Sequence, residues 1–304
     1  MLRIGTRGSR LALWQANYVA GLLRALPGAP PVEIVEILTA GDQVRDVPLA
    51  QLGGEGAFTK EIQRALLAGQ VDVAVHSLKD LPTQPVEGLT LAAVPPRGPT
   101  GDVFVSQRHR SFDALPPGAV VATSSLRRQA QARHRRPDVK LADIRGNVET
   151  RLRKLAEQGL DGLILARAGL ERLGLGDAVT EVLDPAWMLP AVGQGALGLE
   201  CRADDQAALA LVRQLDDPAA RQAVRAERAL LRTLQGGCQV PLGVVATIRA
   251  EGLSLRGAVL SPDGSRRIEQ TVSGPAADAE ALGERLAADL LAAGARDLLA
   301  ARRP

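Results

Sequence analysis

The stretch Gly69-Gln70-Val71-Asp72-Val73-Ala74-Val75 closes a helical pattern at a glycine and continues as an apolar, β-branched run. Such a run is typical of a parallel strand that is buried on both faces of its sheet. The same order of residue types returns in Gly159-Leu160-Asp161-Gly162-Leu163-Ile164-Leu165. Two interpretations are open: the pattern is general to βα units, or the chain holds two similar α/β lobes that face one another across a cleft.

Strand and helix patterns alternate on both sides of these stretches. Ser9 caps a helix whose apolar residues recur at helical spacing, Ser124 or Ser125 caps another, and Asn147 caps a third. The predicted strands of this alternating region are 2–6, 32–38, 71–75, 89–94, 102–106, 119–123, 140–144 and 162–165.

The last part of the chain has a different pattern. A long helix is predicted over 217–234, and a helix with apolar residues at helical spacing closes the chain. Between them, three strand patterns are joined by turns that contain Gly252 and Gly264, which favours an antiparallel meander. These strands are 244–250, 253–260 and 267–272. The tail therefore predicts a small α+β domain.

Length and composition limit the class of protein. A chain of 304 residues is too long for a single core, and 46% hydrophobic with 23% charged residues is ordinary for a soluble globular protein. No apolar run is long enough to cross a bilayer, and the N-terminus enters a strand pattern without a signal peptide. Two cysteines without framework spacing fit a reducing compartment. We expect a cytoplasmic protein that does not contact a membrane.

Basic residues are numerous, so their positions matter more than their number. The net charge is +3, and 37 Lys and Arg with only four lysines (Lys60, Lys79, Lys140, Lys154) leave 33 arginines. Aromatic residues make up 2% of the chain, which argues against a stacking platform for nucleic acid. The three histidines have no metal-ligand spacing, so no metal site is predicted.

Cys238 lies in the run Gly236-Gly237-Cys238-Gln239-Val240-Pro241-Leu242-Gly243. Two glycines let the backbone turn sharply and leave a sulfur uncovered, and Pro241 fixes the exit of the loop. The alternative is a glycine helix cap followed by a cysteine that acts as a small buried hydrophobe.

Asp80 follows the buried strand that ends at Val75, in the run His76-Ser77-Leu78-Lys79-Asp80-Leu81-Pro82. Ligands of open α/β sheets bind at the carboxyl ends of strands. A carboxylate there can stabilise developing positive charge or pass a proton to a leaving amine. The alternative is a polar turn with a local ion pair, and His76 is expected to be an ordered strand-end residue.

Arg127 and Arg128 fall in the first turn of a predicted helix, where cations oppose the helix dipole. Free N–H groups, hydroxyls and two guanidinium groups at one helix start suit a carboxylate or phosphate. Arginines recur at other strand ends, at Arg145 with Arg151 one turn later, and at Arg7 beside Ser9. We expect a strongly anionic ligand; the alternatives are a solvated basic helix or a nucleic-acid binder.

Six stretches of the chain resemble, in the same order, the hydroxymethylbilane synthase family, also called porphobilinogen deaminase. They are 6–16, 76–82, 123–129, 145–148, 189–196 and 236–243. The resemblance covers nearly the whole chain. It implies a transferase that condenses four porphobilinogen molecules head to tail, releases ammonia, and then hydrolyses off the linear tetrapyrrole hydroxymethylbilane.

The resemblance also implies roles for individual residues. Cys238 would hold a dipyrromethane cofactor through a thioether and remain an anchor, and Asp80 would be catalytic. Phe58 is a candidate for a lid or a contact with a ring. The residues expected to bind or assist at the carboxylates of cofactor and substrate are Arg7, Ser9, Ser77, Lys79, Thr123, Ser124, Ser125, Arg127, Arg128, Arg145, Gly146, Arg151, Arg172 and Gln194.

The physical interpretation agrees with these roles. Each ring brings two carboxylates, so a growing product needs many cations, and loss of ammonia leaves a cationic azafulvene that a fixed carboxylate stabilises. One departure concerns the loop before Phe58: Glu55 and Gln51 stand where the family usually has lysine. A role of this loop in holding carboxylates is therefore in doubt.

The expected fold is α/β, with two similar lobes like those of periplasmic binding proteins facing a cleft, and a C-terminal α+β domain with a three-stranded antiparallel sheet. We assign 1–98 with about 194–216 to the first lobe, 99–193 to the second, and 217–304 to the C-terminal domain. The expected protein is a monomer that passes its product to a tetrapyrrole-cyclising enzyme. The alternative function is that of a non-catalytic anion- or solute-binding protein.

Overall fold

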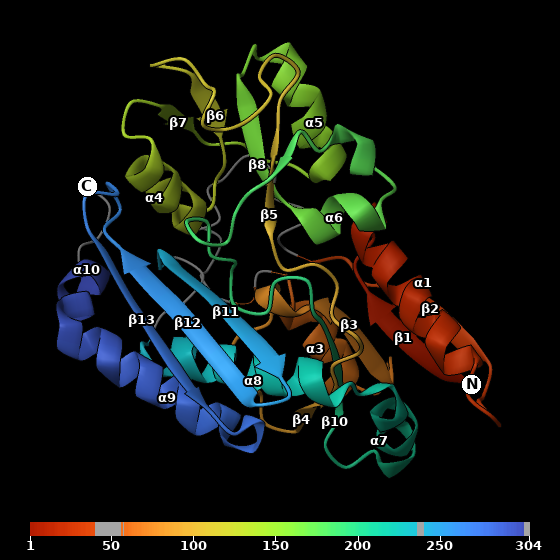
Figure 1. The fold of residues 1–304 in the computed structure, drawn as a ribbon. Helices are drawn as coiled ribbons and strands as arrows, with labels where there is room; N and C mark the ends of the chain where they lie inside the picture. The colour runs from red at the N-terminus through yellow and green to blue at the C-terminus, as the bar shows by residue number, and fades with distance from the viewer. Residues whose placement is uncertain (40–55, 57, 236–239, 301–304) are drawn as a thin grey trace. The chain divides into compact units, whose positions relative to one another are not determined.

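The computed structural model describes residues 1–39, 56, 58–235 and 240–300. The predictions for Gln51, Glu55 and Cys238 lie outside these residues. The chain forms two compact units, Met1–Gly98 with Gly195–Arg221 and Pro99–Gln194 with Gln222–Pro304 (Figure 1). Within the described residues, the structure has no helix long and apolar enough to cross a membrane.

The first unit is built on a five-stranded sheet in the order β2-β1-β3-β10-β4. Strand β1 is parallel to β2 and β3, whereas β10 is antiparallel to β3 and β4. Strand β10 returns from much later in the sequence and separates β3 from β4. The bounds are β1 Leu2–Thr6, β2 Val32–Glu36, β3 Val73–Ser77, β4 Leu89–Ala93 and β10 Leu197–Arg202.

Helices cover both faces of this sheet. Helix α1 (Arg10–Arg24) and helix α7 (Gln206–Val212) pack their apolar residues against one face, and helix α3 (Lys60–Leu67) packs against the other. The predicted cap of α1 is confirmed, because the Ser9 side chain accepts a hydrogen bond from the Ala12 N–H at 3.3 Å. Alternation along β3 explains the two faces: Val73 and Val75 contact the α1 side, and Ala74 the α3 side.

The second unit contains a five-stranded sheet of the same topology, in the order β7-β6-β8-β5-β9. Strand β6 is parallel to β7 and β8, and β5 is antiparallel to β8 and β9. Strands β3 and β8 therefore occupy equivalent central positions, and each follows a glycine in the left-handed region (Gly69 and Gly159). The bounds are β5 Asp102–Val105, β6 Val120–Ala122, β7 Lys140–Ala142, β8 Gly162–Ala166 and β9 Glu181–Val182.

This equivalence confirms that the repeated stretch belongs to two similar α/β lobes. The helices of the second lobe are α4 Leu126–Arg135, α5 Val148–Glu157 and α6 Arg167–Arg172. The predicted caps are confirmed for α4, where Ser125 rather than Ser124 accepts the bond, and for α5, where Asn147 accepts a bond from the Thr150 N–H at 2.9 Å.

The C-terminal part is the predicted antiparallel meander, in the order β11-β12-β13. Its helices α8 (Pro218–Thr233) and α9 (Ala279–Leu290) share an apolar core with the sheet, and α10 (Arg296–Ala300) ends the described chain. The α+β class predicted for this part is thus confirmed. The strands are β11 Leu242–Arg249, β12 Gly252–Leu260 and β13 Arg267–Gly274.

The second lobe and the C-terminal sheet belong to one compact unit, because the β12–β13 turn rests on α4. Gly264 in this turn has φ +76°, and a Cβ there would lie 2.6 Å from Arg133 Cβ and 2.7 Å from the backbone nitrogen of His134. A ring nitrogen of His134, Nδ1, also lies 2.8 Å from the Gly264 carbonyl oxygen. The division into three domains remains a prediction.

A charged network ties the amino end of β3 to its neighbours. Asp72 accepts hydrogen bonds from Arg3 Nε at 3.1 Å and Arg3 Nη2 at 2.8 Å, and one from Arg202 Nη2 at 3.2 Å. Burial raises the pKa of Asp72, but the hydrogen bonds from Arg3 and Arg202 more than offset this effect and lower the pKa to about 2. The ionised carboxylate is therefore favoured in the folded state.

Replacing Asp72 with Asn should lower the free energy of unfolding by about 1–3 kcal/mol at pH 7, because Arg3 loses its paired carboxylate and Arg202 loses one of two, keeping Asp205. The folded pKa of Asp72 lies below its ordinary value, so its contribution is complete above pH about 4 and disappears as the pH falls toward 2. Urea unfolding at pH 7, 4 and 2.5 should show the difference between the two proteins shrinking. A constant difference at all three pH values would contradict this assignment.

Candidate active site

Asp80 lies in a single turn of 3-10 helix, Leu78–Asp80, directly after β3. Leu78 and Leu81 are buried, and the Leu78 N–H donates to the Ala196 carbonyl at 3.0 Å. The Leu81 N–H closes the turn on the Leu78 carbonyl at 3.2 Å. The two buried leucines anchor the turn to the core, whereas Lys79 is exposed and Asp80 is half-buried. Asp80 is therefore a carboxylate on a fixed turn.

Residues after β1 reach the same edge of the first sheet. Arg7 follows β1, the parallel neighbour of β3, and its guanidinium lies over the Phe58 ring at 4.1 Å from the centroid. Ser77 at the end of β3 exchanges hydrogen bonds with the Gln15 amide, at 2.8 and 3.1 Å. The structure thus gathers the predicted residues of this lobe at the carboxyl ends of two adjacent parallel strands. They are Arg7, Ser9, Ser77, Lys79 and Asp80.

In the second lobe, Arg127 and Arg128 lie on a buried carboxylate that sequence reasoning missed. Asp102, at the start of β5, is fully buried, and the two arginines are only 5% and 6% exposed. Asp102 accepts hydrogen bonds from Arg127 Nη1 at 2.6 Å and from Arg128 Nη2 at 2.7 Å. Burial raises the pKa of Asp102, but the charges of Arg127 and Arg128 hold it well below its usual range. The arginines are therefore buried cations that share one anion.

Counted over the described residues, this cluster has two arginines for one aspartate and one donor without a partner. Arg127 Nη1 also donates to the Leu189 carbonyl, and Arg128 Nη1 to the Ile164 carbonyl at 3.1 Å. Arg127 Nε is buried and has no hydrogen-bond partner within the part of the chain that the structure describes. Gln194 joins the cluster through its amide, which donates to Asp102 at 2.9 Å and to the Thr100 carbonyl at 2.6 Å. A buried donor without a partner is costly, so an anion at Arg127 would be favoured.

The remaining predicted residues of this lobe follow its three parallel strands. Thr123, Ser124 and Ser125 follow β6, Arg145 and Gly146 follow β7, and Arg172 lies on α6 after β8. Gly146 has φ +113°, and a Cβ there would lie 2.5 Å from Thr150 Cγ2. Its carbonyl accepts a hydrogen bond from Arg151 Nε at 2.8 Å. Thr123, Ser124, Ser125, Arg145 and Gly146 therefore share the carboxyl edge of the second sheet, whereas Arg172 lies at the far end of α6.

The Ser124 hydroxyl is occupied by the backbone. It donates to the Ile144 carbonyl at 2.6 Å and accepts from the Ile144 N–H at 3.0 Å. This pair of bonds joins the ends of β6 and β7, so Ser124 holds the edge together.

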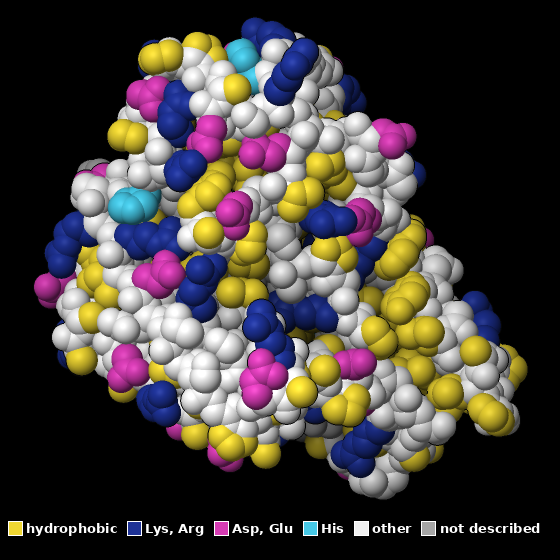
Figure 2. Space-filling view, viewed as in Figure 1, with side chains coloured by type: hydrophobic (Ala, Val, Ile, Leu, Met, Phe, Trp, Pro, Cys, Tyr) yellow, Lys and Arg dark blue, Asp and Glu magenta, His cyan; other side chains and the backbone are white. Residues whose placement is uncertain are grey.

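The later arginines of α4 also have partners: Arg135 bonds Asp113 at 2.7 Å, and Arg133 Nη1 bonds the Pro262 carbonyl at 2.7 Å. On the face drawn in Figure 2, basic side chains are interspersed with acidic ones.

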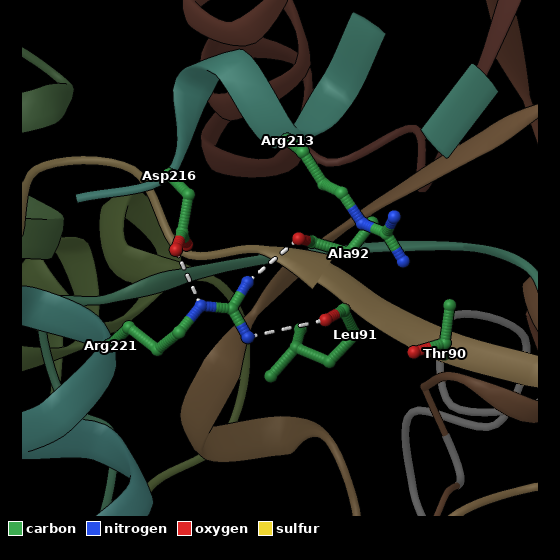
Figure 3. A pocket seen from close by; sticks show the side chains of 6 residues that line it. All are labelled: Thr90, Leu91, Ala92, Arg213, Asp216 and Arg221. Atoms are coloured by element: carbon green, nitrogen blue, oxygen red, sulfur yellow. Dashed lines mark hydrogen bonds and ion pairs between the residues drawn. The ribbon is translucent and has the colours of Figure 1, made fainter. Parts of the chain in front are cut away.

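One hollow of the first unit, about 400 Å³ in volume, lies away from these residues, on edge strand β4. Arg221 fills one wall, where its Nε donates to Asp216 at 2.5 Å and its Nη2 donates to the Ala92 carbonyl at 2.7 Å (Figure 3). The guanidinium thereby covers edge-strand carbonyls that would otherwise be open to another strand. None of the predicted site residues that the structure describes lines this hollow.

Cys201, one of the two cysteines, is unsuited to covalent chemistry. It lies in β10 with no exposed surface, and burial, with the negative charge of Asp205, raises the pKa of its thiol to about 12. A thiol that stays protonated and covered is a poor nucleophile.

Among the described residues, no three of the His, Cys, Asp and Glu side chains are grouped so that they could hold a metal ion.

Two family models cover most of the chain. The model for "Porphobilinogen deaminase, dipyromethane cofactor binding domain" matches residues 2–210, and that for "Porphobilinogen deaminase, C-terminal domain" matches residues 221–292. The chain belongs to the porphobilinogen deaminase family. The family resemblance found in the six sequence stretches is confirmed.

Curated members of the porphobilinogen deaminase family align along nearly the whole chain. The protein of that name from Syntrophotalea carbinolica is 52% identical over 300 residues, which are 99% of this chain and 95% of the relative. That from Geobacter sulfurreducens is 52% identical over 299 residues, 98% of this chain and 94% of the relative. Among solved structures, immunogenic lipoprotein A from Vibrio vulnificus is 14% identical with a TM-score of 0.44, over 74% of this chain and 99% of that one.

Asp102→Asn should leave two buried guanidinium groups without a counter-charge and lower the free energy of unfolding by about 3–5 kcal/mol. The control is Asp113→Asn, which removes the exposed partner of Arg135 and should cost less than about 1 kcal/mol. Urea unfolding of both variants at pH 7 measures the difference. Equal, small losses in the two variants would contradict a structural role for the Asp102 cluster.

Proposed function

We propose that this chain is a hydroxymethylbilane synthase, which joins four porphobilinogen molecules head to tail with release of ammonia and then releases the linear tetrapyrrole. The observation that carries the proposal is the match of both porphobilinogen deaminase family models, supported by relatives 52% identical over nearly the full length. These relatives disfavour the alternative of a non-catalytic solute-binding protein.

The residues of the second lobe suit a dipyrromethane, whose side chains are carboxylates. Arg127 Nε is buried and has no partner in residues 1–39, 56, 58–235 and 240–300, and two arginines on one aspartate give this described cluster a net positive charge. A carboxylate at Arg127 would satisfy the donor and balance the charge. When bound, the dipyrromethane supplies the terminal pyrrole carbon to which substrate is joined. Arg128, Thr123, Ser125 and Gln194 would then orient its carboxylates together with Arg127.

Asp80 is proposed to act on the pyrrole of porphobilinogen. When ammonia leaves the aminomethyl group, positive charge spreads onto the pyrrole ring of the substrate. A carboxylate held on a fixed turn can accept the pyrrole N–H and stabilise that charge where it develops. Lys79 on the same turn and Arg7 on the adjacent strand end would bind the acetate and propionate groups. Arg7 is already oriented by the Phe58 ring.

Cys238 is proposed to hold the dipyrromethane through a thioether. Of the two cysteines, Cys201 is fully buried and its thiol pKa is raised to about 12 by burial, so it is not available for alkylation. The same residue types at each strand end suggest that Arg145, Gly146, Arg151 and Arg172 bind the carboxylates of incoming substrate. Ser9, Ser77 and Ser124 would support the two edges.

Further expectations complete the proposal. The protein is a cytoplasmic monomer, and its product passes to a tetrapyrrole-cyclising enzyme. Neither nucleic acid nor membrane is a partner. The chain works as three domains, divided near residues 98, 194 and 216.

The intact mass of the purified protein should exceed the sequence mass by two pyrrole units, and acidic aldehyde reagent should give a pink-red colour. Cys238→Ala should lose both signals because the attachment atom is gone. Cys201→Ala is the matched control and should keep both. An unmodified mass in a protein that still converts porphobilinogen would refute the assignment of Cys238.

Asp80→Asn should fold normally and retain the dipyrromethane but lose about 10²–10³-fold in kcat, because a neutral amide cannot stabilise the developing charge. Steady-state assays with porphobilinogen measure this loss. Glu87→Gln, which neutralises an exposed carboxylate of the same unit, should keep full activity. Near-normal turnover of Asp80→Asn would remove Asp80 from the mechanism.

A further inference from the structure

Three polar side chains are buried together near the end of β3, the strand that leads into the Asp80 turn. His76 Nε2 lies 2.9 Å from Glu200 Oε2, with the two side chains 2% and 7% exposed. Gln63 on α3 donates from Nε2 to both oxygens of Glu200, at 3.0 and 3.3 Å. With the described residues, His76 Nε2 makes no aligned hydrogen bond, so the directed bonds found for Glu200 come from Gln63. The mechanism above uses none of the three.

Their position relates them to Asp80. His76 lies on β3 four residues before Asp80, and Glu200 lies on β10, which pairs with β3 in the register Gly198↔His76 and Glu200↔Ala74. Residues opposite each other in this register share one face of the sheet, the face on which α3 packs. The trio therefore links β3, β10 and α3 at the place where β3 runs into the Asp80 turn.

Strand β10 also supports the turn directly. A Cβ on Gly198 would lie 2.6 Å from Leu78 Cδ1, so Leu78 rests on the bare backbone of this strand. The Leu78 N–H is bound to the carbonyl of Ala196, just before β10 begins. On the opposite face, Ser77 is bound to Gln15 of α1. The end of β3 is thus fixed on both faces, and a shift of β10 would move the turn.

Stability alone does not explain the trio. Burying a carboxylate carries a desolvation cost, and apolar residues of the same volume often stabilise a core as well or better. Directed polar contacts, by contrast, fix one arrangement of neighbouring elements. The second lobe has the same feature: Asp102 is a buried carboxylate on β5, the strand topologically equivalent to β10, and it orients Arg127 and Arg128. In both lobes, the antiparallel strand holds polar residues in place.

We propose that Glu200 is a positioning residue for Asp80: its hydrogen bonds from Gln63 fix β10 to α3, its 2.9 Å charge contact with His76 holds the end of β3 against them, and the Asp80 carboxylate is thereby placed on the substrate pyrrole. This inference rests on the proposed function. Displacement of a reacting group by about 1 Å costs up to 10²-fold in rate. Because Glu200 does not touch substrate, its loss should lower kcat and leave KM nearly unchanged.

The test compares Glu200→Gln, which keeps the shape and removes the charge, with Gln63→Met, which removes the amide donor. Both should lower kcat by about tenfold or more, with KM within about twofold of the parent and full dipyrromethane loading by mass. Asp72→Asn is the matched control: it removes a carboxylate from the other end of the same sheet region, and should lower the unfolding midpoint without changing kcat.

Reduced kcat in Glu200→Gln and Gln63→Met, against unchanged kcat in Asp72→Asn, supports the proposal. Unchanged kcat in both variants, with any loss confined to thermal stability, overturns it. If Glu200→Gln does not fold, the kcat of Gln63→Met decides. Asp80→Asn separates the positioning role of Glu200 from the catalytic role of Asp80. If Asp80→Asn is inactive while Glu200→Gln has normal kcat, only the positioning role is refuted. If Asp80→Asn is active, the catalytic role of Asp80 is refuted.

Discussion

The structure depends on the rule that a buried carboxylate must be paired. Asp102 in one lobe and Glu200 in the other lie on equivalent antiparallel strands, and each lies against polar side chains that belong to the candidate site or directly precede it. An unpaired charge at either position would cost several kcal/mol. Arginine, glutamine and histidine side chains therefore contact these carboxylates, and the contacts fix the positions of those side chains relative to the strands.

The topology places the rest of the site. In each lobe the central strand has a parallel neighbour, so the polar residues that follow these strands meet at one edge of the sheet. The first lobe supplies a carboxylate on a fixed turn at this edge, and the second supplies cations. The two lobes use one architecture for opposite electrostatic tasks.

Much of this arrangement could be predicted from the sequence. The glycine and apolar run before Val75 and before Leu165 located both central strands, and the capping residues Ser9 and Asn147 located helix starts, because these signals act over a few residues. The partners of Arg127 and His76 could not be found in this way. Asp102 is 25 residues before Arg127, and Glu200 is 124 residues after His76. Only strand pairing brings them together.

The sequence by itself determined the family, the α/β class and the residue types at each strand end, since periodicity and local motifs encode them, whereas the strand pairing established the two similar lobes. Tertiary structure decided which charges are neutralised. It buried Arg127 and Arg128 on Asp102, occupied the Ser124 hydroxyl with backbone, and left Asp80 on an accessible turn. The physical reason is that burial and hydrogen-bond partners are set by residues distant in the chain, and these determine whether a charged group stabilises the fold or remains available to a ligand.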